Sequence, residues 1–249
     1  MVDVSPAVAA GLVVARDATI GIVSRSSPRT LFTCTGAITP GRIIALVGVN
    51  GAGKSTFLRT LAGFSPLVSG TLTVGGLSPS EYRATHGIGI LPESFALPRE
   101  ATGWELLDLS HLAATTGGRH TTPPSDAIDA AIAAAGVDFP LDQAVHRLSN
   151  GMRQRLALAM ALVPKPQLVL LDEPESGLDP TQRVALRERL RAMALAGTTL
   201  IISSHDVSGI GLVADEMWLV DDGRVTIITL HGDRSLEALY AQLPPAWRA

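Results

Sequence analysis

Residues 48–56 read Gly-Val-Asn-Gly-Ala-Gly-Lys-Ser-Thr, and this stretch decides the fold of the chain. Its spacing matches G-x-x-x-x-G-K-[ST], the pattern of a phosphate-binding P-loop. The aliphatic residues 43–47 precede it and predict a strand buried on both faces of a parallel sheet. Phe57 and Leu61 follow at helical spacing, and Gly63 is the expected helix end. The sequence therefore predicts the strand, loop and helix that a P-loop requires.

The glycines of this stretch suit anion binding, because a residue without Cβ lets the backbone curl tightly around a phosphate. The positive end of the following helix strengthens such a site. Lys54 adds a point charge for the outer phosphates of a nucleotide, and the Ser55 hydroxyl is suited to ligate Mg²⁺. A chance glycine-rich turn is the alternative, and the flanking strand and helix argue against it. The predicted nucleotide-binding residues are Gly48, Asn50, Gly51, Ala52, Gly53, Lys54, Ser55 and Thr56.

The overall composition is that of a globular chain. Its 249 residues can bury a full core, as one large domain or two small ones, and 46% of them are hydrophobic. The formal net charge of −3 gives no electrostatic reason to expect a nucleic-acid partner. The single cysteine, Cys34, rules out an internal disulfide and suits a reducing compartment.

No segment of the sequence is suited to cross a membrane, because no apolar run approaches the roughly 20 residues that span a bilayer. Residues 7–15 are the nearest approach to the core of a signal peptide. Asp3 precedes them and no Lys or Arg does, so we do not expect a signal peptide. We expect any role at a membrane to come through a partner.

Short β-prone segments surround the P-loop on both sides and alternate with turn residues. They predict a small antiparallel sheet near the N-terminus that leads into the P-loop strand. The predicted strands are residues 12–15, 19–23, 31–35 and 71–74, and the predicted turns are residues 24–29 and 39–41.

The character of the chain changes between residues 92 and 164, after a predicted buried strand at 87–91. Helices are expected at 104–114 and 126–135, with a loop between them. Ser125 or Asp126 is the expected N-cap of the second helix. We interpret residues 92–164 as a helical subdomain inserted in the α/β core.

The remaining third of the chain returns to alternating strands and helices, as expected for a parallel sheet. Residues 148–155 lead into a helix with Leu156, Met160 and Val163 on one face, and Ser149 is expected to open this helix as its N-cap. The later predicted elements are a buried strand at 168–171, an amphipathic helix at 183–193, a buried strand at 199–203 and a hairpin formed by residues 217–220 and 225–228.

The aliphatic strand at 168–171 ends in Asp172-Glu173-Pro174, well downstream of the P-loop. An Asp at this place is expected to hold Mg²⁺, directly or through water. The following Glu is expected to act as general base toward an attacking water. The alternative is that both carboxylates are ordinary charges at the end of a strand.

Five motifs, taken together and in this order, resemble the nucleotide-binding domain of ABC ATPases, and the resemblance covers nearly the whole chain. The most specific is Leu-Ser-Asn-Gly-Met-Arg-Gln-Arg at 148–155, because it resembles the family signature Leu-Ser-Gly-Gly-Gln/Met. The motifs are residues 48–56, 148–155, 170–174 (Leu-Leu-Asp-Glu-Pro), 176–179 (Ser-Gly-Leu-Asp) and His205.

The resemblance implies an α/β fold: a P-loop NTPase core with a mostly parallel sheet, an N-terminal antiparallel β subdomain and an inserted α-helical subdomain. It implies a single ABC ATPase domain over 1–249, with the core at 1–91 and 165–249 and the helical, signature-bearing part at 92–164. In this family two domains pair head to tail, and ATP lies between the P-loop of one and the signature of the other.

Residue roles follow from the same resemblance. It implies catalysis by Glu173 and His205, and Mg²⁺ ligation by Ser55, Glu93 and Asp172. The residues expected to act in trans, on the nucleotide of the partner, are Ser149, Asn150, Gly151 and Asp179. For Asp179 the alternative is that it only starts a helix, since Pro180 suits a first turn.

The sequence departs from the family pattern at three places. Glu93 stands where the family usually has Gln, and a carboxylate there can still ligate Mg²⁺. Asn150 replaces the first Gly of the signature and keeps its backbone N–H. Residues 19–30 lack the aromatic that usually stacks on adenine, and Phe32 and Tyr82 do not align with that place.

We therefore expect the ATP-binding and ATP-hydrolysing subunit of an ABC transporter, of the exporter kind, since Met152 and Glu93 both resemble that group. It would work as a homodimer or a heterodimer, cytoplasmic and peripheral on the inner face of the membrane. Its partner would be a transmembrane permease, docked near Phe95, Leu97 and Trp104, unless these residues are core.

Two alternatives remain at this point. A soluble ABC ATPase of the DNA-repair type would need a coiled-coil arm, and the interval between Lys54 and Ser149 is too short for one and has no long heptad run. A regulatory subunit with little turnover, in an asymmetric pair, is the second alternative, and the three departures motivate it.

Overall fold

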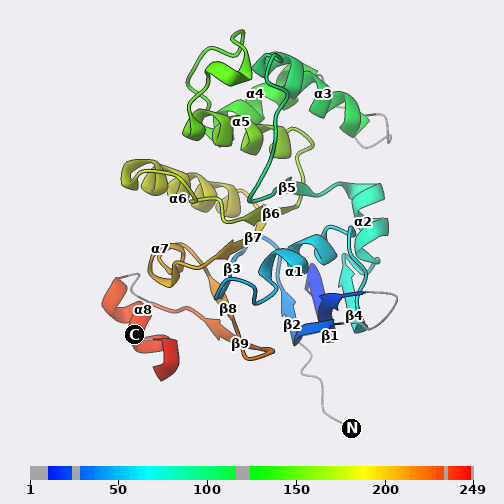
Figure 1. Ribbon diagram of the computed structural model, residues 1–249, viewed down its shortest axis with the longest axis vertical. Coiled ribbons are helices and arrows are strands. Elements are labelled where there is room, and N and C mark those ends of the chain that lie inside the picture. Colours follow the sequence, from blue (N-terminus) through cyan, green and yellow to red (C-terminus); the bar gives the residue numbers. More distant parts are fainter. Residues whose placement is uncertain (1–10, 24–28, 116–123, 233–234, 248–249) are drawn as a thin grey trace.

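The computed structural model describes residues 11–23, 29–115, 124–232 and 235–247. Their strands form one nine-stranded sheet in the order β4-β1-β2-β9-β8-β3-β7-β6-β5 (Figure 1). The strands are β1 (Val13–Ile22), β2 (Arg29–Ile38), β3 (Ile43–Gly48), β4 (Ser69–Val74), β5 (Gly89–Leu91), β6 (Leu168–Asp172), β7 (Thr199–Ser204), β8 (Glu216–Asp221) and β9 (Arg224–Thr229).

The sheet has a parallel part and an antiparallel part. Strands β8, β3, β7, β6 and β5 pair in parallel, whereas β4, β1 and β2 pair antiparallel. The two parts meet where Thr33 of β2 pairs with Arg224 of β9. The predicted α/β fold with a mostly parallel sheet is therefore confirmed, and its antiparallel part is continuous with the parallel one.

Helices cover both faces of the parallel strands (Figure 1). The helices are α1 (Lys54–Leu61), α2 (Pro79–His86), α3 (Gly103–Thr115), α4 (Pro124–Ala135), α5 (Asn150–Leu162), α6 (Pro180–Leu195), α7 (Val207–Gly211) and α8 (Leu236–Gln242). Two short 3₁₀ turns, η2 (Val145–Arg147) and η3 (Pro245–Trp247), complete the described elements.

The core is divided by the sheet, because successive side chains of a strand point to opposite faces. In β3, Ile43, Ala45 and Val47 pack with the helices from α3 to α8. Ile44 and Leu46 of the same strand pack with α1, α2 and the antiparallel strands. All six residues of β3 are buried, which explains the unbroken aliphatic run and holds the P-loop on a rigid strand.

The N-terminal strands differ from the prediction in one respect. Residues 12–15 and 19–23 were expected as two pieces, yet they belong to the single strand β1. Its pairing with β2 is irregular between Ala15 and Ala18, where Asp17 has φ 45°. The polar residues that look like a strand end in the sequence therefore lie at a β-bulge within one strand.

Two boundary predictions were wrong. The strand expected at 87–91 is limited to Gly89–Leu91, because Gly87 has φ 78° and ends the preceding helix instead. Helix α4 begins at Pro124, so Ser125 and Asp126 lie in its first turn and neither is its N-cap. Proline suits the start of a helix, since the N–H it lacks would have no partner there.

Helix α2 was not predicted from the sequence. Its signals are a proline and a capping box, in which Ser78 caps the helix and Glu81 bonds back to the backbone of Ser78. Only Tyr82 of this helix is buried, so it carries no apolar periodicity. Parts of three predicted segments, at 7–15, 24–29 and 115–125, lie outside the described residues. Within those described, no helix combines the length and apolarity needed to cross a membrane.

Candidate nucleotide-binding and hydrolysis site

The P-loop leaves the buried strand β3 and enters α1 with donors available for an anion. Gly51 and Gly53 have φ values of 84° and 107°, which glycine adopts at little cost. Gly53 caps α1 without any side-chain hydrogen bond. The first N–H groups of a helix have no partner within the helix, so a phosphate fits the donors that this loop presents.

The Lys54 ammonium lies inside the loop, with only 6% of its side chain exposed. It donates to the carbonyl oxygens of Gly48, at 2.7 Å, and Val49, at 3.4 Å. It also lies 3.6 Å from Oε1 of Glu173. The lysine is thus held by three oxygens at the position where a bound phosphate would supply stronger ones.

Asp172 and Glu173 stand at the carboxyl end of β6, and β7 fixes both of them. The Ser203 hydroxyl donates to Oδ1 of Asp172 and accepts the backbone N–H of Glu173 at 2.9 Å. Since β6 and β7 are paired in parallel, one hydroxyl on the neighbouring strand reaches both residues. The role of Ser203 leaves no signal in the sequence, because its partners lie about thirty residues away along the chain.

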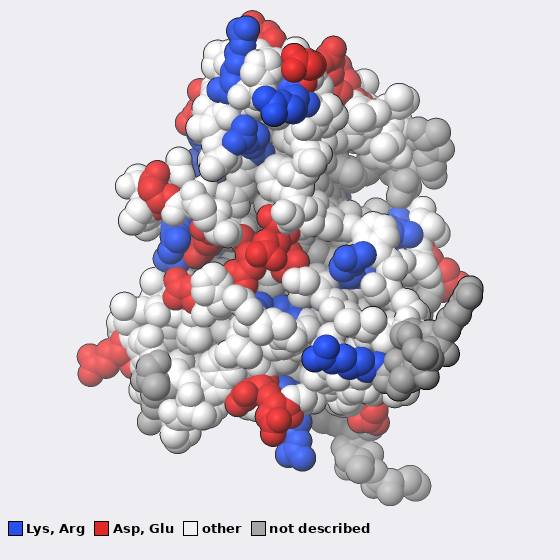
Figure 2. Space-filling view, viewed as in Figure 1, with Lys and Arg blue, Asp and Glu red and all other residues white. Residues whose placement is uncertain are grey.

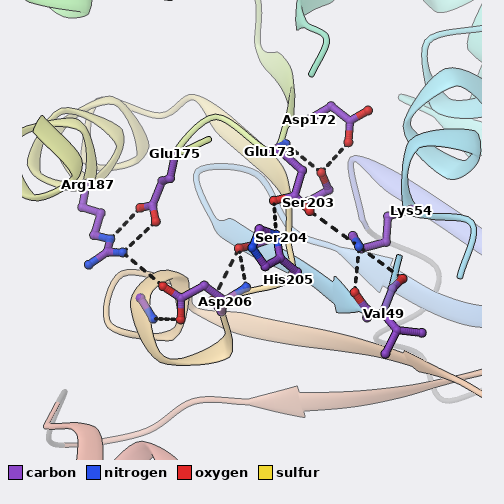
Figure 3. A network of polar contacts seen from close by, with 12 residues as sticks. Val49, Lys54, Asp172, Glu173, Glu175, Arg187, Ser203, Ser204, His205 and Asp206 are labelled. Atoms are coloured by element: carbon purple, nitrogen blue, oxygen red, sulfur yellow. Dashed lines mark hydrogen bonds and ion pairs between the residues drawn. The ribbon is translucent and has the colours of Figure 1, made fainter. Parts of the chain in front are cut away.

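The Glu173 carboxylate joins Lys54 to His205 (Figure 3). Its Oε2 lies 2.9 Å from Nδ1 of His205, and its side chain is 11% exposed against 66% for the histidine. Glu173 has φ 47°, a left-handed value that is uncommon outside glycine and is found preferentially at functional sites. The predicted base and the predicted histidine are therefore brought together, beside the P-loop lysine.

Ser149 and Asn150 of the signature lie on the surface at the start of α5, whereas Gly151 is buried. Ser149 caps this helix by accepting the Met152 N–H at 3.2 Å. Asn150 is exposed, and its side-chain oxygen accepts a hydrogen bond from Arg153. A Cβ on Gly151 would come within 2.8 Å of the Gln182 amide, so this glycine lets α5 approach α6 closely.

Asp179 caps α6 through a complete capping box, in which its Oδ1 accepts the Gln182 N–H at 2.9 Å. The predicted helix start is therefore present. Like Ser149 and Asn150, Asp179 is exposed.

The cavity next to Glu173 contains further carboxylates. It measures about 510 Å³ and lies between the end of β6 and the start of α5, with Glu93, Asp172 and Glu173 among its lining residues. Figure 2 shows acidic side chains gathered at the middle of this face. Ser55 and Asp172 share a smaller adjoining hollow. Oxygen donors of this kind fit Mg²⁺. Among the described residues, no three His, Cys, Asp or Glu side chains are clustered as a metal site.

Comparison with known proteins assigns the family. The family description "ABC transporter" matches residues 31–176, more than half of the chain and the part that holds the P-loop, the signature and the end of β6. The chain belongs to the ABC transporter family. ATP hydrolysis is characteristic of this family's ATP-binding domains.

Two relatives illustrate the range within the family. The Nod factor export ATP-binding protein I of Sinorhizobium fredii is 38% identical over 75% of this chain and 54% of its own length. The aliphatic sulfonates import ATP-binding protein SsuB of Cupriavidus necator is 36% identical over 76% of this chain and 60% of its own length. The chain thus spans little more than half the length of these curated relatives.

A solved structure supports the fold. The dimeric ATP-binding cassette MJ0796, in a post-hydrolysis state bound to ADP and Pi, superposes with a TM-score of 0.76 at 20% identity. The superposition covers 89% of this chain and all of that one. The nine-stranded arrangement is therefore that of an ABC ATPase.

The aromatic residues divide between core and surface. Phe32 and Tyr82 are buried, so neither is available to stack on a base, as their places in the sequence predicted. Phe95 and Leu97 are partly buried against the core and also line the large cavity, whereas Trp104 is 45% exposed. Phe95, Leu97 and Trp104 were expected to be either exposed anchors for a permease or part of the core, and neither description fits all three residues.

A second polar network lies next to Glu173, and sequence analysis missed it. Arg187 of α6 forms a two-pronged ion pair with Glu175 and approaches Asp206, the residue after His205. The hydrogen bonds that Arg187 donates to Glu175 are the main cause of a raised pKa for the Arg187 guanidinium. The sequence contains no periodic signal for such a contact.

Proposed function

We propose that this chain is the ATP-binding and ATP-hydrolysing subunit of an ABC transporter, with a separate permease as its membrane-spanning partner. The observation that carries the proposal is the buried Glu173 carboxylate, which lies 3.6 Å from Lys54 and 2.9 Å from His205. A carboxylate between a phosphate-binding lysine and a histidine has the surroundings that a general base for phosphate hydrolysis needs.

The substrate is ATP, with its phosphates in the loop formed by Gly48, Asn50, Gly51, Ala52 and Gly53. Lys54 leaves its carbonyl partners for the β- and γ-phosphates, and the amides of Ser55 and Thr56 face the same phosphates from the helix end. Ser55, Asp172 and Glu93 would hold Mg²⁺, which would neutralise negative charge on the phosphates.

Hydrolysis transfers the γ-phosphoryl group to water. Glu173 accepts a proton from the attacking water, whose oxygen forms a bond to phosphorus as the bond to the ADP oxygen breaks. His205 contacts the γ-phosphate and keeps the Glu173 carboxylate turned toward the water. The products are ADP and inorganic phosphate.

The active unit is a dimer, with a second copy or a related domain. Ser149, Asn150, Gly151 and Asp179 of each chain face the nucleotide of the other. Support comes from the exposure of Ser149, Asn150 and Asp179, from the positive end of α5 at Ser149, and from the dimeric state of the neighbouring cassette structure. No nucleic acid takes part.

The chain forms a single ABC ATPase domain, with residues 92–164 as the helical part and 1–91 with 165–249 as the core. The permease docks on the helical part, where Trp104 is exposed and Phe95 and Leu97 line the cavity that contains Glu93. The chain is therefore cytoplasmic and peripheral on the inner face of the cell membrane.

The direction of transport is export. Support comes from several relatives named as Nod factor export proteins, and from Glu93 and Met152. An import protein of similar sequence identity is also among the relatives. The proposed direction therefore depends on Glu93 and Met152 as much as on the names of the export relatives.

Glu173→Gln tests the proposal. The variant removes the proton acceptor but keeps the shape, so we expect turnover to fall roughly a thousandfold while ATP still binds. Phosphate release and equilibrium dialysis of labelled ATP measure the two properties. Glu188→Gln, the same change at an exposed position of α6, is the control and should match the parent.

Unchanged turnover in Glu173→Gln would remove this residue from the mechanism. A parent protein that binds ATP but does not hydrolyse it, even with its permease, would instead favour the low-turnover regulatory subunit. The contact between Asn150 and Arg153, at a place where the family has glycine, motivates this second candidate.

A further inference from the structure

The ionic network of Glu175, Arg187 and Asp206 lies beside the candidate site and contains two short hydrogen bonds. Arg187 donates through Nε and Nη2 to the two oxygens of Glu175, each at 2.6 Å. The same Nη2 lies 3.8 Å from Oδ2 of Asp206. Glu175 is 9% exposed, so the pair is largely shielded from water and geometrically fixed.

Together with the contact between Glu173 and His205, the network forms a closed ring of contacts that includes the predicted base and histidine (Figure 3). Glu175 lies two residues after Glu173, and Asp206 directly follows His205. Glu173 and His205 bond to each other at 2.9 Å. Arg187 therefore forms a second link between the loop after β6 and the loop after β7, in addition to the contact between Glu173 and His205.

His205 needs such support, because its own side chain is 66% exposed and little packing restrains it. Its loop is held by Asp206, which caps α7 by accepting the Gly209 N–H at 3.0 Å through Oδ1. The other oxygen of Asp206 remains for Arg187. The position of the imidazole thus depends on where the backbone at 204–206 is anchored.

The residues around position 187 favour arginine over lysine as the link between Glu175 and Asp206. A Cβ on Gly209 would come within 2.0 Å of Nη2 of Arg187, so the guanidinium lies directly on the backbone of α7. A planar fork can bond to Glu175 and still present an edge to Asp206, which a lysine ammonium cannot do with the same geometry. The three residues act as one clamp.

We propose that Arg187 is a positioning residue, which holds His205 against Glu173 by clamping Glu175 and Asp206. The inference rests on the proposed ATPase function for its effect on turnover. The geometric part of the inference does not, because it concerns only contacts among residues of this chain.

The test uses Arg187→Gln and, as a second variant, Glu175→Gln, which keeps the shape of the side chain and breaks the clamp from its other end. We expect kcat to fall about tenfold or more in both, since small misplacements at a reacting centre cost this much. KM for ATP should change little, because Lys54 and the P-loop are untouched. Thermal unfolding confirms that each variant is folded.

Arg191→Gln is the matched control. Arg191 lies one turn further along α6 and pairs with Asp215 at 2.9 Å, so the variant also removes an ion pair between α6 and the core. Because this pair does not involve the His205 loop, kcat should remain close to that of the parent.

A second readout does not require hydrolysis. In ¹⁵N- and ¹³C-histidine-labelled protein, the His205 ring signals, identified by their loss in His205→Ala, should shift or broaden in Arg187→Gln and remain in place in Arg191→Gln. Ring signals that are the same in the parent and in Arg187→Gln would overturn the inference.

The two proposals can fail separately. A parent without ATPase activity whose His205 signals respond to Arg187→Gln contradicts the proposed function and supports the clamp. An active parent whose kcat and His205 signals survive both clamp variants refutes the clamp alone.

Discussion

At the scale of single residues, the site combines strain with restraint. Glu173 adopts φ 47°, and a left-handed conformation of this kind typically costs about 1–3 kcal/mol in a residue with a side chain. Its backbone N–H donates to the Ser203 hydroxyl, and its carboxylate contacts His205 and Lys54, so Glu173 is held in this conformation. These contacts keep the Glu173 carboxylate pointing toward Lys54 and the P-loop.

Lys54→Ala tests the phosphate-binding loop. The ammonium is the only side-chain cation that the described structure puts inside this loop, so its loss should weaken ATP binding at least tenfold, as expected for a charge-assisted contact of about 1.5–3 kcal/mol. Titration with a fluorescent ATP analogue measures the affinity.

The control for this change is Lys165→Asn, which removes the other lysine of the sequence. Lys165 is exposed and has φ 48°, a conformation that asparagine tolerates. If Lys54→Ala bound ATP as tightly as Lys165→Asn, the loop would not be the phosphate site.

At the scale of elements, two helix starts have a structural and a proposed functional role at once. Ser149 accepts the Met152 N–H with its oxygen, which leaves its hydroxyl hydrogen available for a phosphate. Asp179 uses Oδ1 for the Gln182 N–H. Both functions can coexist, since capping occupies only part of the bonding capacity of each side chain.

Variants of Asp179 test its structural role as the cap of α6. Asp179→Ala removes the cap of α6 and should lower the free energy of unfolding by about 1 kcal/mol, whereas Asp179→Asn should retain most of it. Urea denaturation followed by circular dichroism measures both. If the alanine variant were as stable as the parent, the capping box would contribute nothing to stability.

At the scale of the whole molecule, the proposed site is composite, because each chain carries a P-loop and a signature but uses the signature of its partner. The exposed faces at Ser149 and Asp179 are separate from the P-loop in sequence and lie on different helices. In a head-to-tail pair, each nucleotide therefore depends on both copies.

Mixing two inactive variants tests this arrangement. Ser149→Asp keeps a good N-cap but should repel a facing phosphate, and Lys54→Ala weakens the loop. When the two are mixed, half of the dimers are mixed pairs with one intact composite site, so about a quarter of the parent activity should return. Phosphate release from each variant alone and from the mixture measures the effect.

A mixture as inactive as its parts would show that each site is completed within one chain or in another way. Re-purified mixtures of each variant with itself control for exchange and handling. Native mass spectrometry with one copy isotopically labelled verifies that mixed pairs form.

The sequence by itself determined the local features: the P-loop between its strand and helix, the buried strands β3, β6 and β7, the closing hairpin, and the start of α5 at the signature. These follow from neighbouring residues and from regular spacing, which the hydrophobic pattern and turn chemistry encode directly. It misplaced the ends of β5 and α4, since Gly87 and Pro124 act through backbone angles rather than through pattern. It missed α2, which buries only Tyr82.

Only the tertiary structure decided which distant residues meet. The contact of Glu173 with His205, the grip of Ser203 on Asp172, and the clamp of Arg187 on Glu175 and Asp206 join three separate elements. The joining of the two parts of the sheet through Thr33 and Arg224 is likewise visible only in space. Single long-range polar contacts leave no periodic trace in a chain, because their geometry is set by how the strands and helices pack.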